Sequence, residues 1–246
     1  MKIVVSDLTD FLSVEGLKTN VDAINNFVNK GNVFILATNK AMNYLAEDLS
    51  MVNLNCEYYI CNDGAVIFDQ FFNVVYRKDL KQDLVRPIFN HLLDDDNMLE
   101  VYIDTSHGYV KDSNKCANGI VARPYDASKA KVTLDKIVRK YPEVHGHVDD
   151  AMLNIVDSKV TKATALDYIL TEYNYNPDDV ITTGVGTNDY DLINNYTGYT
   201  FNNSADDLKD ISVKTVKDID ELIKEITPTE TAEVDEELEF LFKDYL

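Results

Sequence analysis

Short continuous apolar runs alternate with amphipathic segments in the first third of the chain, and this alternation restricts the folds open to it. Residues 2–7 and 32–38 read as buried strands, whereas residues 19–31 and 40–49 carry apolar side chains at helical spacing. Residues 58–69 predict two strands joined by a tight Asn-Asp-Gly turn. Strands that alternate with helices form a parallel sheet with helices on its faces, so we expect an α/β fold.

The first predicted helix carries signals at both ends. Thr19 and Asp22 have the spacing of an N-cap residue and the third helical residue, and Gly31 follows the last apolar position. We therefore expect this helix to occupy residues 19–31.

The middle of the chain breaks the alternation. Residues 80–95 predict a helix that Pro87, near its middle, divides into two pieces. A hairpin, a second helix and a second pair of strands are predicted to follow, over residues 98–112, 127–141 and 143–157. This order indicates an α+β insert.

The alternating pattern then resumes, with a helix at residues 162–174 and a strand at 179–186. The sequence predicts a Rossmann-like parallel-sheet core, an inserted α+β domain and an acidic C-terminal tail helix. We place the core at 1–76 and 158–226, the insert at 77–157 and the tail at 227–246.

The tail differs in character from the rest of the chain. Thr227 and Glu230 have capping-box spacing, and Pro228 stands at the first helical position. Apolar side chains of the segment fall on one helical face. Two interpretations stay open: the helix docks on its own core, or it binds a protein partner as an amphipathic helix.

The charge of the chain excludes several classes of partner. There are 23 basic and 43 acidic residues, a net charge of -20. Because such a surface repels phosphate backbones and anionic lipid, we expect neither a nucleic acid nor a membrane partner. No apolar run approaches the ~18 residues that span a bilayer. The three cysteines form no CxxC pair, which favours reduced thiols and a cytoplasmic location.

Polar side chains collect where the predicted core strands end. In parallel sheets, the carboxyl ends of the strands surround the ligand crevice. An acid, a hydroxyl, a lysine and an Asn-Asp pair at one crevice suit phosphoryl transfer through an aspartyl-phosphate. The residues at these positions are Asp7, Thr38, Asn39, Asn62, Asp63, Gly64, Lys162, Gly184, Gly186, Asn188 and Asp189.

The motifs, in this order, resemble those of the haloacid dehalogenase (HAD) superfamily, in its Cof-type (type IIB) branch of capped phosphatases. The family's DxDGT segment is matched by Asp7 to Leu12, its strand-ending Thr by Thr38, and its lysine by Lys162. Its GDxxND segment is matched by residues 184–189, and its Asn-Gly-Ala segment by residues 62–65. The resemblance covers about residues 1–226.

The resemblance implies a phosphatase of small phosphorylated metabolites, such as sugar phosphates, with Mg²⁺ as cofactor. It implies Asp7 as the nucleophile and Thr38, Asn39 and Lys162 as phosphate holders. Metal ligation is implied for Asp7, Asn188 and Asp189, and the insert is implied to be a cap over the crevice. Residues that would face the cap or the substrate are Asn62, Gly64 and His107.

Four positions depart from the family's pattern, and two of them bear directly on catalysis. In the first motif, Asp10 replaces a glycine and Phe11 replaces a threonine. The family's general acid/base, two residues after the nucleophile, is replaced by Thr9, which cannot shuttle a proton near neutral pH. A usual magnesium ligand is replaced by Val185. Asp10 or a substrate group would then take the proton-transfer role in a slow enzyme. Alternatively, the chain is an inactive pseudophosphatase that serves as a binding or scaffold protein.

One further cluster and two rival families bear on this interpretation. His145, His147 and Asp149 alternate along one predicted strand, which fits either a metal site or a polar cap surface. A phospho-receiver domain would end near ~120 residues and lack the insert. A metal-free dehalogenase would carry a helical cap directly after the first motif, where only residues 8–18 lie.

Overall fold

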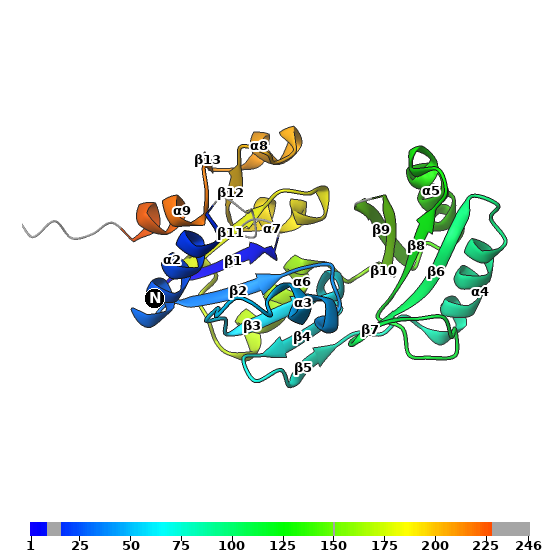
Figure 1. The fold of residues 1–246 in the computed structure, drawn as a ribbon, viewed down its shortest axis with the longest axis horizontal. Coiled ribbons are helices and arrows are strands. Elements are labelled where there is room, and N and C mark those ends of the chain that lie inside the picture. Colours follow the sequence, from blue (N-terminus) through cyan, green and yellow to red (C-terminus); the bar gives the residue numbers. More distant parts are fainter. Residues whose placement is uncertain (9–15, 150, 228–246) are drawn as a thin grey trace, which may run out of the picture.

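The computed structural model describes residues 1–8, 16–149 and 151–227, and it contains two separate sheets (Figure 1). The larger sheet has eight strands in the order β13-β12-β11-β1-β2-β3-β4-β5. Its strands from β13 to β3 run parallel, and β4 and β5 are antiparallel. The strands are β1 (Ile3–Asp7), β2 (Val33–Ala37), β3 (Tyr58–Cys61), β4 (Val66–Asp69), β5 (Val74–Arg77), β11 (Val180–Gly184), β12 (Thr197–Phe201) and β13 (Lys214–Val216).

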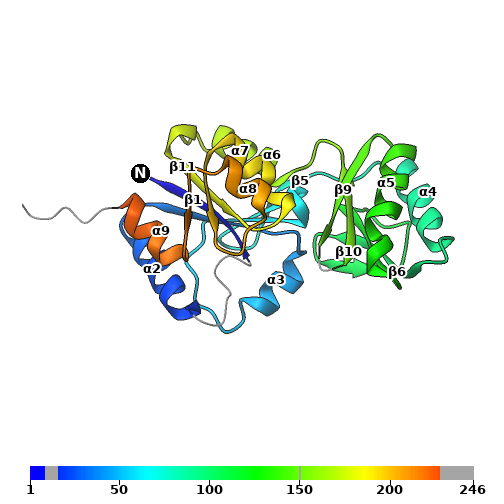
Figure 2. The same cartoon turned by 90° about the horizontal axis from the view of Figure 1, so that it is seen from above.

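Helices cover both faces of this sheet (Figure 2). One face packs against α2 (Leu17–Asn29), α3 (Met42–Asp48) and α9 (Ile219–Ile226), with Phe27 and Phe34 among its buried side chains. The other face packs against α6 (Lys162–Glu172) and α7 (Tyr190–Asn195). A short helix, α8 (Asp206–Ile211), connects β12 to β13. The central strands are buried on both sides, which explains their continuous apolar runs.

The smaller sheet is antiparallel and has five strands in the order β7-β6-β8-β10-β9. Two helices, α4 (Gln82–Leu93) and α5 (Ala130–Lys140), pack against one of its faces. The expected α/β fold with an inserted α+β unit is thus confirmed. The strands are β6 (Met98–Thr105), β7 (Gly108–Val110), β8 (Gly119–Pro124), β9 (Val144–Asp149) and β10 (Met152–Asp157).

Three local expectations differ from the structure. The middle strand β8 was not predicted, because the surrounding loop signals hide its short apolar run. Helix α4 is continuous through Pro87, since its apolar face, with Val85 and Phe89, is held on the smaller sheet. Helix α2 begins at Leu17 after Gly16, so Thr19 lies inside the helix and does not cap it.

The segments near the C-terminus were only partly anticipated. Strand β13 and helix α9 add an edge strand and a packed helix after α8. The predicted tail helix lies outside the described residues, apart from Thr227. Among the helices that the structure describes, none is long and apolar enough to cross a membrane.

Candidate active site

The site lies at the carboxyl ends of the central parallel strands. Strand β1 ends at Asp7, whose register partner on β2 is Ala37, and Thr38 follows directly. On the other side of β1, β11 ends at Gly184 and leads into residues 185–189. Both Asp7 and Thr38 are buried. The topology therefore brings together three segments that are far apart in the sequence.

Lys162 joins two of these segments through its ammonium group. Nζ bonds Asp7 Oδ2 and lies 2.6 Å from Asp189 Oδ1. The side chains of Lys162 and Asp189 are 1% and 2% exposed. Burial by itself lowers the pKa of Lys162, but the negative charges of Asp189 and Asp7 outweigh it and raise this pKa above its ordinary value. The lysine is therefore held as a cation between two carboxyl groups.

The first turn of α6 fixes the position of Lys162. Thr161 is the N-cap, and its hydroxyl accepts a hydrogen bond from the Thr164 backbone N–H at 3.1 Å. The Thr164 hydroxyl in turn accepts one from the Thr161 N–H. The turn Asn62–Gly64 packs directly against this cap, because a Cβ added to Gly64 would lie 2.3 Å from the Thr161 carbonyl oxygen. Gly64 has φ +102°, so both conformation and space require glycine there.

Asp189 is anchored by the loop that precedes it. Its Oδ2 accepts hydrogen bonds from the backbone N–H groups of Val185 and Gly186, at 3.1 and 3.2 Å. Burial raises the pKa of Asp189, and Lys162 opposes that shift. The side chain of Val185 packs against the apolar core of the larger domain. Asp189 thus serves first as the counter-ion that orients Lys162, and Val185 offers no side-chain oxygen.

A cavity of about 230 Å³ opens beside Asp7. Thr38 and Asn39, which the family resemblance implies as phosphate holders, both line it. The domain that contains the five-stranded sheet, here called the smaller domain, closes one side of the cavity. There Asn39 Nδ2 donates a hydrogen bond to Asp149 Oδ2 at 2.7 Å. The lining is completed by Leu8, Lys40, Val185, Gly186, Asn188 and Asp189. Lys40 is a lining residue that the sequence did not indicate, whereas Asp149 belongs to the alternating row that it did indicate.

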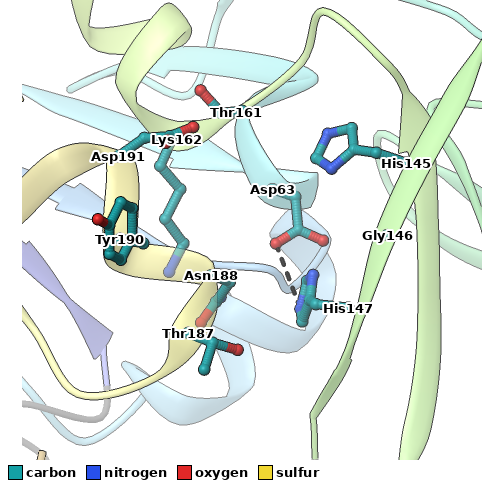
Figure 3. A pocket seen from close by; sticks show the side chains of 10 residues that line it. All are labelled: Asp63, His145, Gly146, His147, Thr161, Lys162, Thr187, Asn188, Tyr190 and Asp191. Atoms are coloured by element: carbon teal, nitrogen blue, oxygen red, sulfur yellow. Dashed lines mark ion pairs between the residues drawn. The ribbon is translucent and has the colours of Figure 1, made fainter. Parts of the chain in front are cut away.

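A second cavity, of about 150 Å³, lies between β9 and the larger domain (Figure 3). Lys162 and Asn188 line it, and Asn188 lines the first cavity as well. His145 and His147 project into it from β9, so the alternating pattern of this strand faces the crevice. Its other lining residues are Asp63, Gly146, Thr161, Thr187, Tyr190 and Asp191.

Some of the remaining sequence candidates lie elsewhere. His107 is exposed, lies near Phe68 and is not among the residues that line either cavity. Asn62 is buried and donates from Nδ2 to the Thr105 carbonyl at 3.2 Å, so it ties the two domains together. Thr9 and Asp10 lie outside the described residues.

Mg²⁺ prefers oxygen ligands, so the side chains that could hold it are those with oxygen atoms at the cavity beside Asp7. Asp7, Asn188 and Asp189 line the same cavity and carry such oxygens, so they fit this ion. The set is weakened, because both oxygens of Asp189 already accept hydrogen bonds. In the part of the chain that the structure describes, no three His, Cys, Asp or Glu side chains are grouped to hold a metal.

A buried acid accompanies the site at the junction of the two domains. Asp104, on β6, is 3% exposed. Its burial and the nearby charge of Asp63 raise its pKa to about 8, although a hydrogen bond from Asn62 acts in the opposite direction. Within the described residues, Asp104 Oδ1 and Asn62 Oδ1 have no hydrogen-bond donor. Asp104 is therefore largely protonated at neutral pH, when its hydroxyl can donate.

The family model for haloacid dehalogenase-like hydrolases matches residues 14–143 and 111–222. No curated protein matches the sequence. Among solved structures, the chain is similar to a protein described as a HAD/COF-like hydrolase from Plasmodium vivax, with a TM-score of 0.80 and 16% identity. The match covers 92% of this chain and 95% of that one.

Two further structures have the same fold over nearly their whole length. One is a HAD subclass IIB sugar phosphatase, at a TM-score of 0.75 and 18% identity, with 92% of this chain and 98% of that chain covered. The other is a haloacid dehalogenase-like hydrolase from B. subtilis, at 0.76 and 14%, with 93% and 99% covered. At these identities, the likeness establishes the fold.

Proposed function

Because the chain belongs to the haloacid dehalogenase-like hydrolase family, we propose that it hydrolyses small phosphorylated metabolites through a phosphorylated Asp7. The observation that carries this proposal is the ammonium of Lys162 between Asp7 and Asp189, two carboxyl groups that line the same cavity. A cation held there neutralises a phosphoryl group that approaches a carboxylate nucleophile. Sugar monophosphates are the substrate class that we favour, supported by the sugar phosphatase among the structural neighbours.

In the proposed first step, Asp7 attacks the phosphorus, and the bond between phosphorus and the alcohol oxygen breaks. Thr38 and Asn39 line the cavity where the phosphoryl oxygens would lie, and Lys162 supplies a positive charge. In the second step, water attacks the phosphorus of the aspartyl-phosphate and frees Asp7. Each step needs a proton transfer, to the leaving alcohol and then from the water.

Hydrolases of this family generally use Mg²⁺. Here Asp7, Asn188 and Asp189 would hold the ion, and when bound it would supply positive charge against the phosphoryl oxygens. We propose that this site is weak, since Val185 provides no ligand and Asp189 is already engaged with Lys162 and two backbone N–H groups.

We propose that turnover is reduced compared with an enzyme that has an acid at position 9. Thr9 cannot transfer a proton, and general acid–base catalysis contributes about 10²–10⁴-fold. The rival function is that of a pseudophosphatase that binds a metabolite or a protein. The specific observation in its favour is the packing of Val185 into the apolar core. A cytoplasmic location belongs to the same proposal and is supported by three free cysteines.

The deciding experiment compares the native chain with Asp7→Asn. Phosphate release is measured with Mg²⁺ on p-nitrophenyl phosphate and on a panel of hexose, pentose and glycerol monophosphates. We expect turnover of at least one panel member by the native chain and none by Asp7→Asn. Equal background rates for the two proteins on every compound would refute the enzyme and support the binding role.

A further inference from the structure

Strand β9 presents a row of polar side chains to the larger domain. His145, His147 and Asp149 lie two residues apart, and all three line the cavities of the crevice. Val144 and Val148 point the other way and pack into the core of the smaller domain. The row therefore forms one wall of the candidate site.

Two members of the row have protein partners. Asp149 Oδ2 accepts a hydrogen bond from Asn39, and His145 Nε2 lies 2.5 Å from the carbonyl oxygen of Val160. The first contact holds β9 against the loop that follows β2, and the second holds it against the segment that leads into α6. They also account for the polarity of both side chains without any ligand.

His147 is different. Its side chain is 14% exposed, and its Nε2 is buried without a hydrogen-bond partner among the described residues. The nearest acid is Asp63, whose Oδ1 lies 3.7 Å from Nε2, an ion pair when the ring is protonated (Figure 3). A buried polar nitrogen without a partner costs about 1–3 kcal/mol, so its retention calls for an explanation.

The surroundings of His147 connect it to the nucleophile. Lys162 lines the same cavity, and its ammonium bonds Asp7. Asn188 lines both this cavity and the one beside Asp7. A leaving group that extends from Asp7 past Asn188 into the second cavity would therefore meet His147.

We propose that His147, paired with Asp63, carries out the proton transfers that Thr9 cannot perform. This inference rests on the proposed phosphatase function and names the acid/base of that same site. Asp63 is a positioning residue: its carboxylate, 3.7 Å from Nε2, attracts that nitrogen when the ring is protonated and leaves Nδ1 for the substrate. Its own place is fixed by the turn Asn62–Gly64 against Thr161.

His147 can supply the proton that the leaving alcohol needs and take the proton that the attacking water loses. When Asp7 attacks and the phosphorus–alcohol bond breaks, protonated His147 gives its proton to the leaving oxygen. Neutral His147 then takes a proton from the water that attacks the phosphorus, and the bond from phosphorus to Asp7 breaks. Inorganic phosphate, the alcohol, the free carboxylate and protonated His147 remain, so no further reactant is needed.

The test uses two leaving groups that differ in their need for a proton. The native full-length chain is compared with His147→Gln on p-nitrophenyl phosphate and on a hexose monophosphate. We expect hydrolysis of the hexose phosphate to fall about 10²–10⁴-fold. The variant should still release a rapid burst of nitrophenolate, followed by slow turnover, because nitrophenolate leaves unprotonated whereas hydrolysis of the aspartyl-phosphate needs the base.

Three further variants sharpen the result. His91→Gln is the matched control, because this cap histidine lies 3.3 Å from Lys140 Nζ and lines neither cavity; its rates should equal native rates. Asp63→Asn should lower kcat while KM is retained. Thr9→Asp added to His147→Gln should restore hexose phosphate turnover. If His147→Gln only damaged the structure, a new acid at position 9 would not restore it.

Each contrary result overturns either the inference alone or the proposed function as well. Native rates for His147→Gln overturn the inference and leave the phosphatase intact. The inference is also overturned if His147→Gln loses both the burst and the turnover and Thr9→Asp does not rescue them. It is overturned as well if Asp10→Asn loses hexose phosphate turnover while His147→Gln is active. No turnover and no burst in the native chain overturn the proposed function itself, and the inference with it.

Discussion

Lys162 Nζ lies 2.6 Å from Asp189 Oδ1, and the same ammonium bonds Asp7, so one buried cation serves two carboxyl groups. A buried ion pair adds little net stability compared with apolar packing, because desolvation offsets the attraction. The arrangement is therefore better explained by the proposed reaction than by the stability of the fold. It holds a positive charge beside the position where a phosphoryl group would meet Asp7.

Removal of that charge should destabilise the protein. Lys162→Met leaves Asp7 and Asp189 buried without their cation, and we expect the free energy of unfolding to fall by about 3–5 kcal/mol. Urea denaturation measures the change. Lys131→Met is the control, because Lys131 forms an exposed pair with Asp135 on α5; its effect should stay within about 0.5 kcal/mol. Equal stability of the two variants would contradict a charged Lys162.

Gly64 should tolerate alanine far less than Gly31 does. Both have positive φ, but a Cβ at Gly31 meets nothing within 4 Å, whereas one at Gly64 lies 2.3 Å from the Thr161 carbonyl oxygen. We expect Gly31→Ala to cost about 1 kcal/mol from backbone strain. Gly64→Ala should lower the free energy of unfolding clearly more and should also lower phosphate release, since it displaces Thr161, the N-cap residue that precedes Lys162. Equal costs would show that the turn does not position the lysine.

Asp104 should make stability depend on pH in an unusual direction. Its pKa of about 8 in the folded chain lies above the ordinary value near 3.9, so the folded state retains a proton that the unfolded state releases. Stability from this residue should therefore fall as pH rises from about 4 to about 8. The free energy of unfolding of Asp104→Asn, relative to the native chain, should increase over this range. An unchanged difference between the two proteins would contradict the shift.

Replacement of Val185 should strengthen the metal site. Val185→Asp restores a carboxylate at the position where the family carries one, and we expect Mg²⁺ affinity to rise about tenfold or more. Isothermal titration with Mg²⁺ alone measures this without reference to activity. Val185→Asn has the same shape without the charge and should gain less. Equal affinity in all three proteins would place the ion elsewhere.

The sequence was sufficient for the family and for the strand ends, because these depend on local patterns. The resemblance to Cof-type haloacid dehalogenase-like proteins is confirmed by the family model and by the structural neighbours. Asp7 and Thr38 line one cavity because continuous apolar runs mark parallel strands whose ends share one edge. The residues at the carboxyl ends of neighbouring parallel strands could therefore be predicted to lie close together from the strand pattern alone. Lys162 reaches Asp7 from the first turn of α6 and was indicated by the family resemblance.

The contacts between the two domains could not be predicted in this way. The pairing of Asn39 with Asp149 and the approach of His147 to Asp63 depend on how β9 is placed over the crevice, and no local pattern encodes that placement. Strand β8 was missed for a related reason. Its pairing with β6 and β10 is a tertiary property that its short sequence does not reveal.

The covalent state of Asp7 during turnover tests the proposed phosphatase mechanism most directly. The native chain is mixed with p-nitrophenyl phosphate and Mg²⁺, quenched in acid and examined by intact-protein and peptide mass spectrometry. We expect one added phosphoryl group, located on Asp7 and lacking in Asp7→Asn. A native chain that releases phosphate without any phosphoryl adduct, or an adduct that persists in Asp7→Asn, would contradict this mechanism.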